Sequence, residues 1–444
     1  MKRLLLRTPK SPFTVVSPET AYHRNLIGDN AGNLVFLQAT YKILGTSDQR
    51  LDPGNFSVDP VLAPVVNERY DAYVMPLANA FRPSYELKLK RIVRFIERLR
   101  IPVVILGVGA QSTPRFTFEE LAPMEPLIRR FVGAVLDRGP SIGVRGEITA
   151  EYLFGLGFRD VEVIGCPSMF LHADRMPVEK RLPALGREAP ISINVSPYVK
   201  SMGPITLSHA ERYRHLTYIA QDHPTLGAML GAGWPRDRRP GDPIPLHSAH
   251  PFFANRLARF YVEPWPWIED LERMEFSFGT RIHGNIAALL AGTPAYVFAH
   301  DSRTLELARY FEIPHRPMAD VPPDVDAADL YAEADYTGLV QGHARRWRTF
   351  TDYLARHELR HVWQEGEDPA AFDERIRATA YPPAVSVTDA MLRPASAAGR
   401  VLRLRHRTMR SMWAGTEWAV TATRRLRRQA KLKRRVRGVV RRLR

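Results

Sequence analysis

Short apolar runs alternate with segments of helical periodicity along most of this chain. Residues 101–109, for example, are almost entirely apolar and end in glycine, whereas residues 85–99 place apolar side chains at helical spacing and basic ones outside. Short apolar runs that end in glycine are typical of buried strands in parallel sheets. We predict further strands at 13–16, 70–75, 141–145, 161–164, 190–196, 258–262, 276–279 and 295–298, and further helices at 34–44, 119–136, 147–156, 208–220, 265–274, 304–311 and 337–363.

Strands and helices that alternate in this way predict a doubly wound α/β fold. A proline-rich, charged segment near residues 176–189 separates two such series, so we expect two Rossmann-like halves that face each other across a cleft. The Ala/Ser-rich segment before the C-terminus is typical of a disordered linker. We place the first domain at 1–175, the second at 190–335, C-terminal helices at 336–380, the linker at 381–399 and a basic amphipathic tail at 400–444.

One stretch, residues 276–298, combines this pattern with polar side chains suited to chemistry. An apolar run ends at Gly279, Arg281 and His283 follow, and a helix rich in small residues leads into another apolar run. The turn between a parallel strand and the next helix is the usual location of ligand sites, and the first N–H groups of a helix favour anions. Arginine suits phosphate or carboxylate, and histidine transfers protons near neutral pH. We therefore predict an anion-binding site with acid–base function, against the alternative of a helix-capping histidine and an ion-paired arginine.

Other candidate residues lie at the ends of predicted strands or at helix starts. Arg145 closes a strand and faces the same crevice or forms an interdomain ion pair, while Gly32 and Gly109 serve a ligand or simply a turn. Trp265 offers a platform for a sugar ring or anchors the core at a helix start. His247 and His250 lack a nearby third ligand, so we predict no metal site.

Composition limits the class of protein. A chain of 444 residues with 45% apolar content fills more than one core, and its single cysteine, Cys166, excludes intramolecular disulfides. The N-terminus has too short an apolar segment for a signal peptide, and no run approaches the ~18 apolar residues of a membrane span. We therefore expect a cytoplasmic protein.

The formal net charge of +16 belongs to the C-terminal tail. Residues 400–444 contain 17 Lys or Arg and one acidic residue, so residues 1–399 are neutral, with 46 basic and 46 acidic side chains. Apolar residues of the tail share one helical face among these arginines, a pattern typical of helices that lie on anionic membranes. We expect peripheral contact with the inner face of the cell membrane, the alternatives being another polyanion or a solvated tail. Nucleic acid is not the expected partner.

Several motifs in order resemble the polysaccharide pyruvyl transferase family. Residues 279–294 are similar to its Gly-x-Arg-x-His turn, small-residue helix and Gly-x-Pro exit. Residues 30–33 resemble its Asn-x-Gly-Asp block, 105–110 its Gly-x-Gly strand end, and 141–171 its Arg-bearing strand with a Gly-Asp-Pro block. Two positions depart from the family pattern, because Asn33 and Cys166 each stand where the family has an aspartate.

The resemblance implies a fold like that of GT-B glycosyltransferases and a reaction of phosphoenolpyruvate with two hydroxyls of one sugar, which yields a pyruvate ketal and phosphate. It implies that Arg281 and Arg145 bind the donor's anionic groups and that His283 is a general acid or orients the donor. The backbone N–H groups of Gly284 and Gly32 are expected near the phosphate. Phosphoenolpyruvate is the donor substrate, no cofactor or metal is expected, and the acceptor is a saccharide of a cell-surface polysaccharide or its lipid-linked precursor.

Two other functions remain open on the sequence. A GT-B glycosyltransferase that uses a nucleotide sugar would bind the diphosphate through Arg281. A non-catalytic saccharide-binding or scaffold protein of polysaccharide assembly is favoured by the loss of carboxylates at Asn33 and Cys166.

Overall fold

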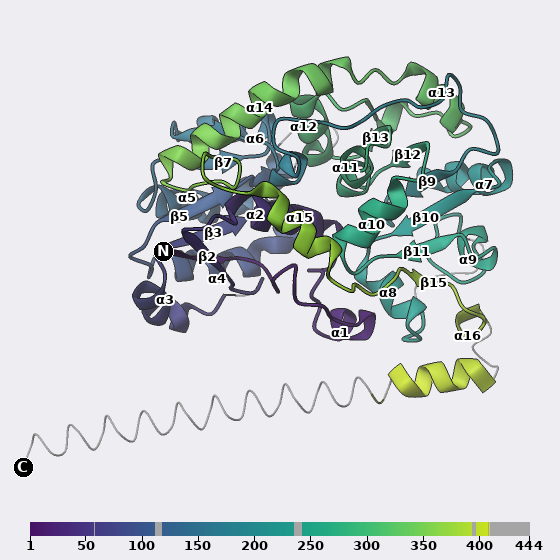
Figure 1. The fold of residues 1–444 in the computed structure, drawn as a ribbon, viewed down its shortest axis with the longest axis horizontal. Coiled ribbons are helices and arrows are strands. Elements are labelled where there is room, and N and C mark those ends of the chain that lie inside the picture. The colour runs from purple at the N-terminus through teal and green to yellow at the C-terminus, as the bar shows by residue number, and fades with distance from the viewer. Residues whose placement is uncertain (57, 112–117, 235–241, 393–396, 407, 409–444) are drawn as a thin grey trace, which may run out of the picture.

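The computed structural model describes residues 1–56, 58–111, 118–234, 242–392, 397–406 and 408 (Figure 1). These residues form two α/β halves that lie side by side, the first at the left of Figure 1 and the second at the right. Each half has a parallel sheet with helices packed against it, which confirms the predicted pair of Rossmann-like halves.

The first half contains a four-stranded parallel sheet in the order β2-β1-β3-β5. A second parallel pair, β7 with β8, continues from β5 through a bridge between Val108 and Val144. The strands are β1 (Lys2–Leu6), β2 (Gln49–Pro53), β3 (Ala72–Pro76), β4 (Asn79–Phe81), β5 (Val103–Leu106), β6 (Gly109–Ala110), β7 (Ile142–Val144) and β8 (Val161–Val163). The helices are α1 (Pro18–His23), α2 (Gly32–Leu44), α3 (Ala63–Arg69), α4 (Glu86–Ile96), α5 (Glu125–Leu136) and α6 (Glu147–Gly155).

The second half contains a seven-stranded sheet in the order β14-β13-β12-β9-β10-β11-β15, parallel except for β15. Its strands are β9 (Ile191–Asn194), β10 (Leu216–Ala220), β11 (Ala258–Phe260), β12 (Phe276–Gly279), β13 (Ala295–Ala299), β14 (His315–Pro317) and β15 (Val385–Ser386). Its helices are α7 (Met202–Arg212), α8 (His223–Met229), α9 (Pro251–Ala254), α10 (Pro264–Leu271), α11 (Ile282–Leu290), α12 (Ser302–Phe311) and α13 (Ala327–Glu333).

The strand, turn and helix predicted around Arg281 are confirmed as β12, α11 and β13. The turn depends on Gly279, whose φ of 138° is rarely adopted by residues with a side chain. A Cβ atom there would collide with the backbone carbonyl oxygen of Asn194 on the paired strand β9. Glycine is therefore required where β12 ends beside β9.

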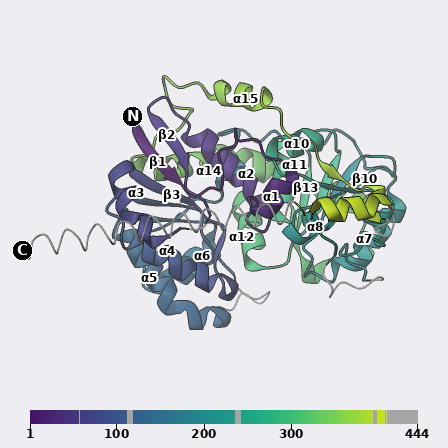
Figure 2. The ribbon, with the colours of Figure 1, turned by 90° about the horizontal axis from the view of Figure 1, so that it is seen from below.

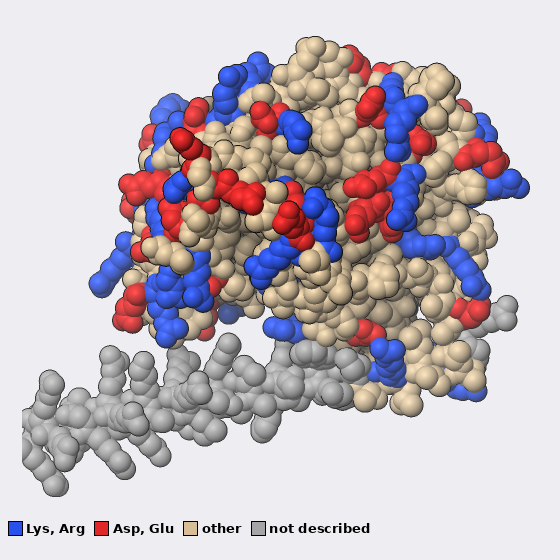
Figure 3. All heavy atoms as spheres, in the orientation of Figure 1, with Lys and Arg blue, Asp and Glu red and all other residues tan. Residues whose placement is uncertain are grey.

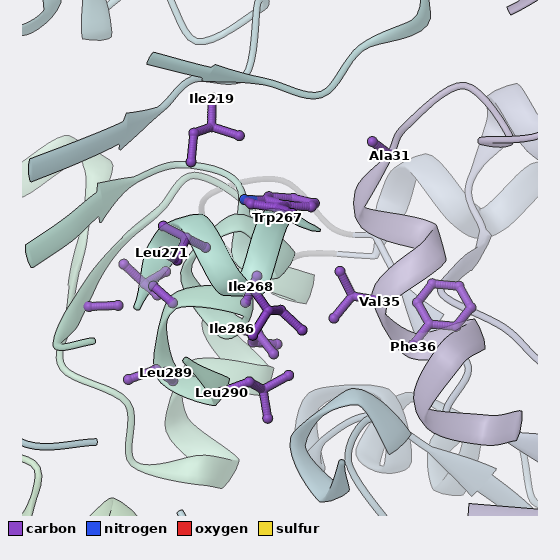
Figure 4. Close-up of a cluster of buried hydrophobic side chains, with 14 of the residues drawn as sticks. Ala31, Val35, Phe36, Ile219, Trp267, Ile268, Leu271, Ile286, Leu289 and Leu290 are labelled. Carbon is purple, nitrogen blue, oxygen red and sulfur yellow. The ribbon is translucent and has the colours of Figure 1, made fainter. Parts of the chain in front are cut away.

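One hydrophobic core joins the two halves. Helix α2 of the first half packs against α10 and α11 of the second, with Val35 directed toward Ile286 and Trp267 (Figure 4). These side chains are buried, and the same cluster continues into both sheets. The apolar periodicity of α2 thus serves the contact between the halves as well as the first domain.

The chain returns to the first half after α13. Helix α14 (Thr337–Arg356) crosses over α12 and α6 in Figure 1, and its Tyr353 hydroxyl donates to the Ile105 carbonyl of β5, 2.8 Å away. Helix α15 (Pro369–Arg377) lies beside the N-terminal segment, where Phe372 and Phe13 have ring centroids 5.2 Å apart. The predicted C-terminal helices therefore stabilise the arrangement of the two halves.

Several elements differ from the sequence prediction. The segment predicted as one helix at 208–220 forms only the end of helix α7, which stops at Arg212, and then strand β10 at Leu216–Ala220. No strand forms at residues 13–16, and the first strand is β1, whose three leucines fill the centre of the sheet. Part of the segment predicted as a disordered linker forms β15, which pairs with β11, and the short helix α16 (Asp389–Leu392). Both short segments gain order from tertiary pairing rather than from their own periodicity.

The predicted basic tail lies mostly outside the described residues, which end at residue 408. Its first part, residues 397–406, is helical and lies near α1 and α8 (Figure 2), where Arg405 Nη2 donates to Glu19 Oε1 at 2.8 Å. Within the described ranges, no helix is both long and apolar enough to cross a lipid bilayer. Positive and negative side chains are interspersed over the face shown in Figure 3, in keeping with the neutral charge of residues 1–399.

Candidate functional site

A cavity of about 950 Å³ lies between the two halves. Arg7 and Leu77 reach it from just beyond β1 and β3 of the first sheet, and Pro197 and Arg281 from just beyond β9 and β12 of the second. The cavity therefore lies at the carboxyl ends of parallel strands from both sheets, where ligands bind in open α/β folds.

Positive side chains dominate the cavity wall. Among the described residues, the wall includes only two acidic side chains, Asp29 and Asp222. The basic residues that line it are Arg7, Arg24, Arg82, Lys88, Arg91, Lys200, Arg281 and Arg303. Because the body of the protein is neutral overall, this concentration of positive charge is local, and it makes the cavity electrostatically suited to an anionic ligand.

Some of these positive charges are balanced within the protein. Lys88 Nζ lies 3.3 Å from an Asp29 carboxylate oxygen, Lys200 Nζ lies 3.1 Å from Asp242, and Arg303 forms an ion pair with Asp301. Four arginines of the wall have no carboxylate within 4.0 Å among the described residues: Arg7, Arg82, Arg91 and Arg281. These four are available to bind ligand anions.

Arg281 is a predicted site residue that reaches the cavity. It is the N-cap of α11, and its backbone N–H donates to Asn194 Oδ1 at 2.7 Å. Its side-chain Nε donates to the carbonyl of Val195 at 3.3 Å, and in the described part of the chain no protein acceptor occupies its two Nη nitrogens. The guanidinium is thus fixed at one edge and can offer its terminal N–H groups to a ligand.

Arg82 and Arg303 bring positive charge from opposite halves into the same region. Burial lowers the pKa of Arg82, and the charge of Arg303 lowers it further. Burial alone would lower the pKa of Arg303 as well, but the Asp301 carboxylate raises it above its usual value. An anion between these two guanidinium groups would relieve their mutual repulsion.

A tyrosine and a histidine lie at the same wall. The Tyr198 hydroxyl is 3.1 Å from His300 Nε2, and the same nitrogen lies 3.5 Å from Asp301 Oδ2. Burial lowers the pKa of His300 to about 4 despite the nearby Asp301 carboxylate, so His300 is neutral at pH 7. Tyr198 lines the cavity and places an O–H group beside the ion pair of Arg303 and Asp301.

His283 lies behind the cavity wall rather than on it. Its side chain is 7% exposed, packs against the ring of Phe36 with centroids 5.4 Å apart, and places Nε2 3.5 Å from Cys166 Sγ. Burial lowers the pKa of His283 well below its usual value, and the charges of Arg145 and Arg303 lower it further. His283 is therefore neutral at physiological pH in this arrangement.

Arg145 lies in the same buried layer. Only 2% of its surface is exposed, Nε donates to the Gly107 carbonyl at 3.0 Å, and Nη2 lies 3.6 Å from Cys166 Sγ. Its guanidinium is 5.7 Å from the centre of the Phe36 ring, and Phe36 in turn lines the cavity. Arg145 and His283 thus support the cavity from behind, and a direct contact with a ligand there would require Phe36 to move.

The glycines expected near the ligand, two of them beside its phosphate, have their backbone N–H groups engaged. Gly32 N–H donates to Asn30 Oδ1 at 2.9 Å, Gly284 N–H to the Arg281 carbonyl at 2.9 Å, and Gly109 N–H to the Ala78 carbonyl at 2.8 Å. A phosphate contact from any of them would replace an existing hydrogen bond. Their small size has a packing role, since a Cβ atom on Gly32 would lie 2.8 Å from His283 Cβ.

Asn33 and Trp265 occupy different places. Asn33 lines the cavity, with Nδ2 donating to the carbonyls of Ile27 and Gly28 at 3.0 and 2.9 Å, so it holds the loop before α2. Trp265 is half-buried on α10 and does not line the cavity, whereas Trp267 is fully packed in the core between the halves (Figure 4). The sugar platform expected at Trp265 has no counterpart in the cavity wall.

Sequence reasoning missed most of the positive charges on the first half. Arg7 directly follows β1, and Arg82 follows the short strand β4, so each is a polar residue at the end of an apolar run. A polar residue at the end of an apolar run could have identified Arg7 and Arg82 from the sequence. The same pattern also describes Arg145, which is buried in the interior. Within the described ranges, no group of three or more His, Cys, Asp or Glu side chains is arranged to hold a metal ion.

Comparison with known proteins bears on the family and the fold. The polysaccharide pyruvyl transferase family matches residues 30–302 of this chain. No curated protein matches.

Solved structures with similar folds share little sequence with this chain. It is 10% identical to UDP-GlcNAc 2-epimerase from Neisseria meningitidis bound to UDP-GlcNAc, with a TM-score of 0.45 over 80% of this chain and 100% of the other. The UDP-GlcNAc 2-epimerase of Methanocaldococcus jannaschii is also 10% identical, with a TM-score of 0.42 over 80% of this chain and 99% of the other. An uncharacterized protein from Klebsiella pneumoniae is 11% identical to this chain, with a TM-score of 0.35 over 70% of this chain and 88% of the other. At these values the three structures support no conclusion about what this chain binds.

Proposed function

Because the chain belongs to the polysaccharide pyruvyl transferase family, we propose that it transfers the enolpyruvyl unit of phosphoenolpyruvate to a saccharide in the cavity between its two halves. The observation that carries this proposal is the group of arginines at the strand ends, above all Arg281 and Arg82, which have no carboxylate within 4.0 Å among the described residues. Phosphoenolpyruvate carries a carboxylate and a phosphate, the two groups that arginine binds best.

The reaction we propose requires three proton transfers and three changes in the C–O bonds at carbon C2 of the donor. The methylene carbon C3 takes up a proton and becomes a methyl group while positive charge develops at C2. One sugar hydroxyl bonds to C2, and its proton restores the acid that protonated C3. The C2–O bond to phosphate breaks, and a second hydroxyl bonds to C2 and passes its proton to the departing phosphate. The products are the pyruvate ketal and inorganic phosphate.

The arginines have a second role in this reaction beyond binding. Negative charge accumulates on the departing phosphate, and the guanidinium groups of Arg281, Arg82 and Arg303 are already in place to stabilise it. Their positions are set before the ligand binds, by Asn194 and Val195 for Arg281 and by Asp301 for Arg303. We therefore expect no metal ion or cofactor in the reaction.

Of all the steps, proton donation to C3 has the fewest candidate residues in the cavity. We propose that Tyr198 supplies it, because Tyr198 lines the cavity beside Arg303 and its hydroxyl contacts His300 Nε2. For His283 we propose the second of its two expected roles, that of a positioning residue. It is neutral and separated from the cavity, and it holds Phe36 and Cys166 behind the donor site.

The function is tested by measuring phosphate release from phosphoenolpyruvate with a panel of cell-envelope oligosaccharides. Wild type should release phosphate only with an acceptor, and Arg281→Gln should reduce kcat/KM by about 100-fold or more, as expected when a charged contact to the transition state is lost. Arg94→Gln is the matched control, since Arg94 is exposed on α4 and does not line the cavity.

The other two functions give different results in the same assay series. A glycosyltransferase would be protected against heat by a nucleotide sugar and not by phosphoenolpyruvate. A non-catalytic protein would release no phosphate with any acceptor, and its cellular function would survive Arg281→Gln.

A further inference from the structure

The cavity wall formed by the first half carries more positive charge than the proposed donor requires. If Arg281 and Arg82 bind the two anionic groups of phosphoenolpyruvate, Arg7 and Arg91 remain without a carboxylate within 4.0 Å among the described residues. Both belong to the first half, on the loop after β1 and on α4. Their charge calls for a second anion in the same cavity.

Arg7 is the stronger indication, because it is a buried cation. Its side chain is 7% exposed and its Nε nitrogen has no hydrogen-bond partner. Nη2 donates to the Tyr85 hydroxyl at 2.7 Å and Nη1 to the Pro76 carbonyl at 3.4 Å, so its other partners are neutral. An unpaired buried charge is unfavourable, and an anionic ligand would relieve that penalty.

Arg91 and Lys88 extend this positive charge along the wall. They lie three residues apart on α4, hence on one face of the helix, and both line the cavity. Lys88 Nζ lies 5.7 Å from the centre of the Tyr85 ring, whose hydroxyl accepts from Arg7. Tyr85 therefore connects the buried guanidinium of Arg7 with the exposed Lys88, and among the described residues only Lys88 of the three cations is balanced, by Asp29.

We propose that Arg7, Lys88 and Arg91 form a second anion subsite and that the acceptor carries a diphosphate group bound there. This proposal rests on the proposed function only because it assigns Arg281 and Arg82 to the donor, phosphoenolpyruvate. Three cations are more than one carboxylate ligand needs to neutralise its charge, and they suit a diphosphate, whose negative charge extends over two phosphate groups. A volume of about 950 Å³ leaves room for phosphoenolpyruvate and a diphosphate-linked sugar together.

The test is calorimetric titration of the full-length protein with inorganic pyrophosphate in the presence of saturating phosphoenolpyruvate. We expect pyrophosphate to bind wild type under these conditions, and Arg91→Gln to weaken this binding by about 10-fold while changing phosphoenolpyruvate binding less than twofold. Arg94→Gln lies one turn away on the same helix, outside the cavity, and should bind both ligands as wild type does. The basic tail is present in all variants, so its own affinity for polyanions cancels.

The proposal is overturned if pyrophosphate does not bind the phosphoenolpyruvate-saturated protein, or if Arg91→Gln and Arg94→Gln bind it equally. If phosphoenolpyruvate itself does not bind, the proposed donor fails, and a loss of pyrophosphate binding specific to Arg91→Gln still supports the subsite. Uridine diphosphate and farnesyl diphosphate, titrated in the same way, distinguish a nucleotide-linked from a lipid-linked acceptor, and preferential binding of either supports the subsite.

Discussion

Cys166 Sγ lies 3.5 Å from His283 Nε2 in the interior, directly behind the cavity. Arg145 Nη2 approaches the same sulfur at 3.6 Å, so a histidine and a buried cation meet at one sulfur atom. The family pattern that this sequence resembles has an aspartate at this position, and a carboxylate there would lie next to both groups. Burial lowers the pKa of His283 well below its usual value, and the charges of Arg145 and Arg303 lower it further.

We predict that Cys166→Asp raises the pKa of His283. A carboxylate near Nε2 favours the imidazolium, whereas wild-type burial and Arg145 favour the neutral ring. NMR titration of the His283 imidazole should show no protonation between pH 8 and 5.5 in wild type and a titrating ring in Cys166→Asp. Cys166→Ser is the control without charge and should resemble wild type. A His283 ring that titrates equally in all three proteins would contradict the prediction.

Tyr198→Phe should lower kcat more than it raises KM for phosphoenolpyruvate. The substitution removes the proposed proton donor and leaves Arg281 and Arg303 in place, so donor binding is retained while the chemical step slows. We expect a loss of about 100-fold in kcat, within the usual contribution of a positioned acid. Steady-state phosphate release measures both constants. A variant with wild-type kcat would show that another group protonates C3.

Glu306 should make the folded state less stable as the pH rises. It lies on α12, where it is only 2% exposed. Its carboxylate accepts hydrogen bonds from the Thr149 N–H and hydroxyl, each at 3.0 Å. Burial raises the pKa of Glu306 to about 8. Between the ordinary carboxyl pKa and pH 8 the unfolded chain therefore binds fewer protons than the folded chain, so stability falls as the pH rises through this range.

Glu306→Gln removes this titration. Urea denaturation at pH 5.5 and pH 8 should show that the variant gains stability relative to wild type at the higher pH, by roughly 1.4 kcal/mol for each pKa unit of the shift that is crossed. An identical pH dependence of wild type and variant would show that Glu306 does not carry the extra proton.

Gly279→Ala should destabilise the protein by about 2 to 4 kcal/mol. Alanine would have to adopt the φ of 138° and place its Cβ against the Asn194 carbonyl, at the strand end that presents Arg281. Gly133→Ala is the matched control, because Gly133 lies inside α5 with no atom within 4 Å of an added Cβ. There alanine should be neutral or stabilising by up to about 1 kcal/mol. Thermal unfolding of both variants provides the comparison.

The sequence by itself determined the local elements and the class of fold. The apolar run, Gly279, Arg281 and the small-residue helix predicted β12 and α11 correctly, because those residues interact with near neighbours whose spacing is visible in the chain. The charge count also separated a neutral body from a basic tail without any coordinates.

Only the tertiary structure decided which side chains share the cavity. Arg7, Arg82 and Arg281 are far apart in the sequence, and they meet because parallel strands of two sheets end on either side of one cavity. Arg145 and His283 show the converse, since a strand-end arginine and a motif histidine have the same sequence signature whether they face a ligand or the core. The direction of a side chain depends on how α2 packs against α11, a long-range contact that the residues nearby in sequence do not specify.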